Sequence, residues 1–159
     1  MTVLVLLLLL LVANGAPLIA HHLLGDRLSW PLDGGRRFLD GRPLLGPAKT
    51  LRGVGVAVLA CAMAGSAVGP SLATGALFGL YAMAGDVLAS FIKRRMGIAP
   101  SHSALGLDQG LEALLPLLAL RGRLSLHWTE IALTVVGFFV LEIVLSRILY
   151  RLRVRRRPI

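Results

Sequence analysis

The sequence has a single cysteine, only eight acidic residues and few aromatic side chains, which make up 6% of its 159 residues. Cys61 cannot form an intramolecular disulfide, and no cysteine or histidine lies near it at the spacing of a metal site. The four histidines show no ligand spacing with one another, and neither an HExxH nor a GxSxG motif occurs. These absences argue against a disulfide-stabilised domain, a zinc peptidase and a serine hydrolase.

Long apolar runs dominate what is present, because 56% of the residues are hydrophobic and only 16% are charged. The runs alternate with short charged stretches, a pattern typical of a helical protein that crosses a membrane several times. We therefore predict an all-α integral membrane protein: one polytopic domain over residues 1–159 with about five transmembrane helices. The predicted spans are residues 2–24, 53–69, 72–92, a short segment at 105–120 that is broken at Pro116, and 127–149.

The first apolar run also fits a second interpretation. Ala13 to Ala16 resemble the small-residue cleavage site of a secretory signal. The basic residues that begin such a signal are missing from MTVLVLLLLL. We favour a first spanning helix and keep a cleaved signal as the alternative.

The basic residues are unevenly placed and give a formal net charge of +9. Most of them lie in the loops at 25–52 and 93–104 and in the tail at 150–159. Five spans place all three segments on one side of the membrane, which the positive-inside rule makes cytoplasmic, with the N-terminus outside. This predicts a multi-pass protein of the cell membrane and explains the charge without a nucleic-acid partner. Such basic loops also attract anionic lipids and nucleotide phosphates.

One face of the third span carries a set of polar side chains. Asp86 and Ser90 are four residues apart, and Lys93 and Arg94 follow one turn later. At 3.6 residues per turn the four side chains share one helix face. Ionisable residues inside a span are costly and usually functional, which makes Asp86 the clearest candidate. The alternative is that Asp86 only pairs with Lys93 or Arg94 at the membrane interface.

A second polar set opens the fourth span. Asp108 and Glu112 lie four residues apart on one helix face, with Gln109 beside them. Two like charges at this spacing repel each other, so a cation is expected nearby: Arg, Lys or a divalent metal. For Asp108 the alternative is that it only stabilises the first helical turn through the helix dipole.

A third polar set lies in the first loop, where Lys49, Thr50 and Arg52 follow the turn-forming Gly46 and Pro47. Their charge and hydrogen-bond donors suit phosphate oxygens. The loop is not a Walker A motif, because the first glycine and its four-residue spacing are missing. Basic residues here also set the membrane topology, which is the simpler interpretation. Further polar candidates in this loop are Asp33 and Arg42.

Taken together, these segments resemble one family. The stretch DGGRRFLDGRPLLGPAKTLRG is similar to the first-loop signature of CDP-archaeol synthases, membrane cytidylyltransferases related to the phosphatidate cytidylyltransferases. GDVLASFIKRRMGI, followed by LDQ, is similar to the second signature. The chain length and the plan of five spans also match. The second signature contributes Gly85, Asp86, Ser90, Lys93, Arg94, Leu107, Asp108 and Gln109.

The loop departs from the family pattern around its lysine. That pattern usually reads Gly-Asp-Gly-Lys-Thr-Trp-Arg-Gly. In this chain Pro47 and Ala48 replace the Asp-Gly pair before Lys49, and Leu51 replaces the aromatic residue. An acid that the family places beside the lysine is therefore missing here.

The resemblance implies a CTP-dependent cytidylyltransferase of phospholipid biosynthesis, which converts a membrane lipid phosphate to a CDP-lipid and releases pyrophosphate. Mg²⁺ or another divalent cation suits this reaction. The implied metal ligands are Asp86 and Asp108, which with Lys93 form the catalytic set. The implied nucleotide- and phosphate-binding residues are Lys49, Thr50, Arg52, Ser90 and Arg94, with Asp33, Arg42, Gln109 and Glu112 as weaker candidates.

Two other functions remain open at this point. The first is a non-catalytic family relative that acts as a membrane scaffold or binds anionic lipid, which the altered lysine motif favours. The second is a small transporter that uses Asp86 and Glu112 as a polar path. The placement of these acids near one membrane face, and the lack of a clear inverted repeat, argue against a transporter.

Overall fold

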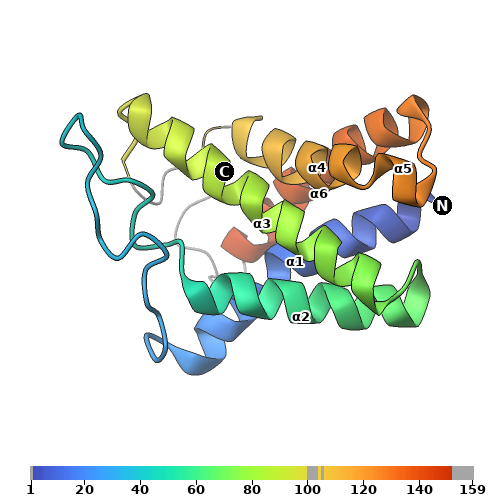
Figure 1. Cartoon of the computed structure of the whole chain (residues 1–159), viewed down its shortest axis with the longest axis horizontal. Coiled ribbons are helices and arrows are strands. Elements are labelled where there is room, and N and C mark those ends of the chain that lie inside the picture. Colours follow the sequence, from blue (N-terminus) through green and yellow to red (C-terminus); the bar gives the residue numbers. More distant parts are fainter. Residues whose placement is uncertain (1, 100–103, 105, 152–159) are drawn as a thin grey trace.

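The computed structural model describes residues 2–99, 104 and 106–151, and all regular elements in these residues are helices (Figure 1). Two isolated antiparallel bridges, one between Pro31 and Thr50 and one between Arg37 and Pro43, shape the first loop. The prediction of an all-α membrane fold is confirmed. The helices are α1 (Val3–Leu24), α2 (Leu51–Val68), α3 (Leu72–Arg95), α4 (Leu107–Ala119), α5 (Arg121–Leu124) and α6 (Trp128–Arg151).

Four of these helices, α1, α2, α3 and α6, are long and apolar enough to cross a membrane. The hydrocarbon core is about 30 Å thick, and the 13 residues of α4 rise only about 20 Å. The short helix α5 follows directly at the end opposite the first loop (Figure 1). A fifth span at α4 therefore stays a prediction. The predicted break at Pro116 is wrong, because α4 continues through this residue to Ala119.

The predicted boundaries differ from the structure mainly at the site end of α3. This helix continues to Arg95, so Lys93 and Arg94 lie on its last turn and not in a loop. The first loop occupies residues 25–50. Part of the predicted loop at 93–104, and the basic tail beyond Arg151, lie outside the described residues.

Hydroxyl side chains begin the two central helices. Thr50 precedes α2 and its hydroxyl oxygen accepts a hydrogen bond from the Gly53 amide at 3.1 Å. Ser71 precedes α3 and accepts in the same way from the Thr74 amide at 3.2 Å. Each cap satisfies a backbone donor that the first helical turn leaves free. The cap on α2 matters for the site, because it fixes the residue after Lys49.

Small residues let α2 and α3 pack with their backbones almost in contact. A methyl group on Gly75 would overlap the Cys61 carbonyl, and one on Gly79 would lie 2.9 Å from the Ala57 oxygen. Close packing through glycine is typical of helices in lipid, as the sequence predicts for these spans. A core of larger side chains joins the other helices, with Leu6, Leu9, Leu10, Phe78, Leu117 and Phe138 fully buried.

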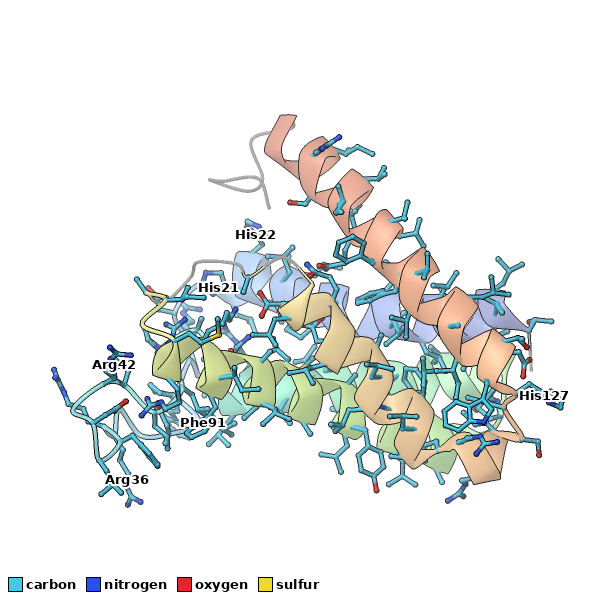
Figure 2. The ribbon with its side chains drawn as sticks, turned by 90° about the horizontal axis from the view of Figure 1, so that it is seen from above. His21, His22, Arg36, Arg42, Phe91 and His127 are labelled. Carbon is cyan, nitrogen blue, oxygen red and sulfur yellow. The ribbon has the colours of Figure 1, made fainter. Side chains whose placement is uncertain are left out.

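The functional candidates gather at one end of the bundle. The first loop lies there with the C-terminal end of α3 and the N-terminal end of α4, whereas the α2–α3 turn and α5 lie at the opposite end (Figure 1). Figure 2 shows Arg36, Arg42 and His21 toward the first end and His127 at the other, with α6 leaning away from the other helices. The polar residues thus converge on one face as predicted. Which face is cytoplasmic stays a prediction.

Candidate functional site

The centre of the site is an ion pair between the first loop and α3. The Lys49 ammonium contacts both carboxylate oxygens of Asp86, at 2.6 and 2.5 Å. The two side chains are 21% and 17% exposed, so the pair is largely shielded but still accessible. Lys49 of the loop and Asp86 of α3, which are separate candidates in the sequence, therefore form one ion pair.

The pair borders a cavity of about 540 Å³ between α1, the first loop, α2 and α3. Polar groups line one part of its wall, and apolar side chains line the rest. A lining of this mixed kind suits a ligand with both a charged and an apolar part. The polar lining comprises Asn14, His21, Asp26, Ser29, Lys49, Thr50, Arg52 and Asp86, and the apolar lining includes Pro17, Leu18, Val54, Met83 and Val87.

A second carboxyl reaches this centre from α4. Glu112 is buried, and its carboxyl interacts electrostatically with Asp86, Lys49 and Glu142. The Asn14 amide of α1 donates to Glu112 at 2.6 Å and to Glu142 of α6 at 2.9 Å. Acids from three helices therefore meet around one lysine and one amide, and Lys49 supplies the cation expected near Glu112.

Gln109 extends this polar network on α4. Its side-chain amide donates to Glu142 at 3.1 Å, and its carbonyl oxygen accepts from the Gly106 amide at 3.0 Å. Gln109 therefore caps the start of α4 and ties α4 to α6.

A second ion pair joins α3 to α4 nearer the end of the bundle. The Lys93 ammonium lies 2.7 and 2.8 Å from the two carboxylate oxygens of Asp108. Asp108 also accepts from the Ala104 amide at 3.2 Å, in the segment just before α4. Lys93 supplies the cation expected beside Asp108, and the same carboxylate also orders the start of its helix.

Arg94 is buried next to this ion pair and makes fewer hydrogen bonds than its guanidinium can donate. Its Nη2 donates to the Ala99 carbonyl at 3.1 Å, whereas Nε and Nη1 have no hydrogen-bond partner in the structure of the described residues. Ser90, one turn earlier on the same helix face, is also buried. A buried guanidinium with free donors is costly and favours an anionic ligand.

Arg52 and Thr50 line the cavity but already have contacts of their own. Arg52 donates to the carbonyl oxygens of Gly25, at 2.9 Å, and Arg27, and its Nη2 lies 3.3 Å from the His21 ring. These contacts hold the guanidinium where α1 ends. Thr50 accepts from Gly53 as the cap of α2, which leaves its own hydroxyl hydrogen free to donate.

Asp33 and Arg42 organise the loop and are not among the residues that line the cavity. Burial raises the pKa of the Asp33 carboxyl, but hydrogen bonds from the backbone amides of Gly46, Gly35 and Leu45 outweigh burial and hold the pKa below its usual value. Arg42 donates to the Arg95 carbonyl at 2.7 Å at the end of α3.

Comparison with known proteins identifies the family. A family model described as CarS-like CDP-archaeol synthase matches residues 61–158. A CDP-archaeol synthase from Sulfurisphaera tokodaii is 38% identical over 162 residues, which cover 93% of this chain and 89% of the relative. The chain belongs to the CDP-archaeol synthase family.

Other family members and one solved structure agree. A CDP-archaeol synthase from Hyperthermus butylicus is 44% identical over 106 residues, which cover 62% of this chain and 60% of the relative. A solved structure described as an intramembrane enzyme for archaeal membrane lipids biosynthesis superposes with a TM-score of 0.69 at 26% identity and covers 87% of this chain and 91% of its own. The family resemblance, the multi-pass membrane location and the assignment as a transferase of lipid biosynthesis are confirmed.

The structure adds site residues that the sequence analysis missed. Asn14 looks like an interruption of the first apolar run, and Glu142 lies deep within the fifth, five residues before Arg147. A polar residue inside a span is itself a functional signal, so both could have been found. His21, which lines the cavity from the last turn of α1, carries the same signal, whereas Asp26 lies just beyond the helix and does not.

Proposed function

We propose that this member of the CDP-archaeol synthase family catalyses CTP-dependent conversion of a membrane lipid phosphate to a CDP-lipid, with release of pyrophosphate. The observation that carries the proposal is the set of cations at the site end of the bundle. Lys49 and Arg52 border the cavity, and Lys93 and Arg94 lie buried farther along the same face of α3 as Asp86. Four cations suit the charge of a nucleoside triphosphate and a second phosphate.

The apolar wall of the cavity supports a lipid as the second substrate. Leu18 and Asn14 line this cavity and also a smaller one between α1 and α6, which includes Leu11, Gly15 and Leu145. A phosphate near Lys49 would therefore have an apolar route toward the bilayer on the α1 side. The relatives are named CDP-archaeol synthases, so we propose an isoprenoid ether lipid phosphate of the archaeal type as the substrate.

The proposed step is an in-line displacement at phosphorus. An oxygen of the lipid phosphate attacks the α-phosphorus of CTP, the bond from that phosphorus to the bridging oxygen of the β-phosphate breaks, and pyrophosphate leaves with the electron pair. The attacking oxygen is already anionic, so the step needs no general base. The protein has to hold two anions in line and offset their repulsion, the role we propose for Lys49, Arg52, Lys93 and Arg94. Thr50 and Ser90 would donate hydrogen bonds to the same phosphates.

A bound Mg²⁺ is part of this proposal, although among the described residues no group of three or more His, Cys, Asp or Glu side chains forms a metal site. Mg²⁺ needs only one or two protein carboxylates, because phosphate oxygens and water complete its shell. Asp86 would hold the metal with Asp108 as the second ligand, as the family resemblance implies. Glu112, which interacts with Asp86, is the alternative second ligand. When bound, the metal would neutralise charge on the phosphates.

The test is pyrophosphate release by detergent-purified protein, given CTP, Mg²⁺ and a panel of lipid phosphates with ether-linked isoprenoid or ester-linked acyl chains. We expect release that requires both CTP and an isoprenoid ether lipid phosphate. Asp86→Asn should lower turnover at least about 100-fold, because it removes charge from the pair with Lys49. Glu130→Gln, which changes a partly buried acid at the opposite end and leaves an oxygen to accept from the His127 amide, is the matched control.

Two results would contradict the proposal. Folded protein that releases no pyrophosphate with any lipid phosphate would favour the non-catalytic relative, with Pro47 and Ala48 as the first positions to restore to Asp-Gly. Unchanged turnover in Asp86→Asn would show that the chemistry occurs elsewhere.

A further inference from the structure

We infer that the far side of α3 is a clamp that positions the lysine-bearing loop over the site. The clamp consists of Phe91 and Arg95 on α3 and of Phe38, Asp40 and Arg42 on the hairpin at residues 36–44. None of these residues lines the cavity beside Lys49 and Asp86. The effect of the clamp on substrate binding rests on the function proposed above, but the contacts that form the clamp do not.

The Arg95 guanidinium is the centre of the clamp. It lies 4.6 Å from the ring centre of Phe38 and 5.1 Å from that of Phe91, and the two rings meet edge to face at 5.4 Å. Its Nη1 contacts Asp40 at 2.6 Å, and its Nη2 donates to the Pro43 carbonyl at 2.6 Å. Arg95 thus contacts the hairpin through the Phe38 ring, one carboxylate and one carbonyl, and Phe91 of its own helix packs against the same ring. A lysine could not make both hydrogen bonds in this fork geometry.

Arg42 makes the reciprocal contact from the hairpin to the helix. Its Nη1 donates to the carbonyl oxygens of Arg94 and Arg95, at 3.4 and 2.7 Å, which the end of a helix leaves without intrahelical partners. Gly97 has a φ of +78°, which suits glycine, and a methyl group there would lie 3.4 Å from Nη1 of Arg42. The hairpin therefore caps α3 while α3 holds the hairpin (Figure 2, where Arg42 and Phe91 are labelled).

Hydrogen bonds within the loop connect the hairpin to Lys49. The Asp33 carboxylate accepts from Gly35 at one end of the hairpin and from Leu45 and Gly46 at the other. The Lys49 amide in turn donates to the Gly46 carbonyl at 3.2 Å. Asp33 therefore closes the base of the hairpin and joins it to the turn that carries Lys49.

The same helix carries the other half of the site. Asp86 and Arg95 are nine residues apart, which places them on opposite faces of α3 and about 13 Å apart along its axis. Phe91 and Arg95, four residues apart, share the clamp face. One rigid helix thus presents Asp86 to Lys49 on one side and anchors the loop that holds Lys49 on the other. Opening the clamp would loosen the turn before Lys49 without changing either member of the ion pair, while the Lys49 carbonyl still accepts from the Leu32 amide at 2.7 Å.

The clamp contributes more to the order of the first loop than to the stability of the helix bundle. The side chains of Arg95 and Asp40 are 21% and 38% exposed, and ion pairs with this much solvent contact contribute little to global stability. The helices are joined by the buried core and by the glycine contacts of α2 and α3. Loss of the clamp should therefore raise the entropy cost of ordering the loop when substrate binds, which appears in KM for CTP more than in kcat.

The test compares Phe38→Leu and Arg95→Lys with wild type in detergent. Trypsin should cut after Arg36 and Arg37 roughly tenfold faster in both variants. KM for CTP should rise roughly fivefold, with kcat within about twofold and only a small shift of the melting midpoint. Phe38→Tyr, which keeps the ring, should restore both the protection and KM. Arg123→Lys, at an exposed arginine of α5 at the opposite end, is the control and should behave as wild type.

Three results would count against the inference or its basis. Unchanged cleavage in both variants would show that the clamp does not hold the hairpin. A joint fall of kcat and the melting midpoint at unchanged KM would show a merely structural role. If wild type turns over no CTP, the proposed function fails, and the cleavage rates alone still decide whether the clamp exists.

Discussion

At the scale of single residues, Arg94 is the clearest case of a buried side chain that keeps hydrogen-bond donors for a ligand. It is buried on the last turn of α3, yet Nε and Nη1 lack hydrogen-bond partners among the described residues. Each buried donor left without a partner costs about 1–3 kcal/mol. A bound phosphate would supply the missing acceptors, so in the unbound protein we expect this cost to outweigh the hydrogen bond of Arg94 to Ala99 and its attraction to Asp108.

Replacement of Arg94 by methionine should therefore separate stability from binding. Arg94→Met removes the unpaired donors and keeps most of the side-chain volume, and Lys93 still neutralises Asp108. We expect an equal or higher melting midpoint without substrate, loss of the stabilisation that CTP and Mg²⁺ give wild type, and KM for CTP at least about tenfold higher. Thermal unfolding with and without CTP measures both effects, and Arg123→Met is the matched control. A marked fall in the midpoint of substrate-free Arg94→Met would mean that Arg94 is a structural residue.

At the scale of helices, the approach of α4 to α3 sets the distance between their carboxyl groups. Gly85, the residue before Asp86, faces the backbone of α4, and a methyl group there would overlap the Leu111 carbonyl and crowd the Glu112 Cα. The missing side chain at this position is therefore what allows Glu112 to reach Asp86. The close packing and the site chemistry depend on the same helix contact.

Gly85→Ala tests this dependence. The methyl group forces α4 outward, which should cost about 1–3 kcal/mol of stability, and a displacement of Glu112 by about 1 Å should lower turnover about 100-fold. Gly110→Ala is the control, because nothing lies within 4 Å of a methyl group there and alanine favours a helix. Turnover and the melting midpoint are measured for both. Equal activity of the two variants would show that the α3–α4 spacing does not control the chemistry.

The helices themselves were largely predictable, because apolar runs of membrane length are read directly from the sequence. The residues at which the helices begin and end were less predictable. Lys93, Arg94 and Arg95 suggest a loop by charge, but the helix continues because Asp108, Asp40 and the Ala99 carbonyl provide partners for them. Pro116 suggests a break, yet proline is tolerated in a helix that packs against its neighbours.

At the scale of the whole molecule, the pairings of the site were the part that the sequence could not supply. Lys49 and Asp86 lie 37 residues apart, and Asn14 and Glu142 lie 128 apart. Local periodicity places Asp86 on a helix face but does not say which distant residue meets it. Family signatures selected Lys49, Asp86, Lys93 and Asp108 together, but not the amide of Asn14 or the carboxyl of Glu142.

The two ends of the molecule differ enough to decide its orientation by experiment. The hairpin of the first loop carries Leu39, which is 97% exposed, and His127 is exposed at the opposite end (Figure 2). The native Cys61 is buried, so a chain with Cys61→Ala accepts a single new cysteine as a reporter. Positive-inside orientation places Leu39 in the cytoplasm and His127 outside.

Leu39→Cys and His127→Cys, each made in the Cys61→Ala chain, should therefore react differently with a membrane-impermeant maleimide. In intact cells only His127→Cys should be labelled, and Leu39→Cys should be labelled only after the membrane is permeabilised. Wild type, with Cys61 alone, is the control and should stay unlabelled. CTP is a cytoplasmic metabolite and cannot cross the bilayer unaided, so the proposed reaction requires this orientation. Labelling of Leu39→Cys in intact cells would place the site on the outer face and remove CTP as its substrate.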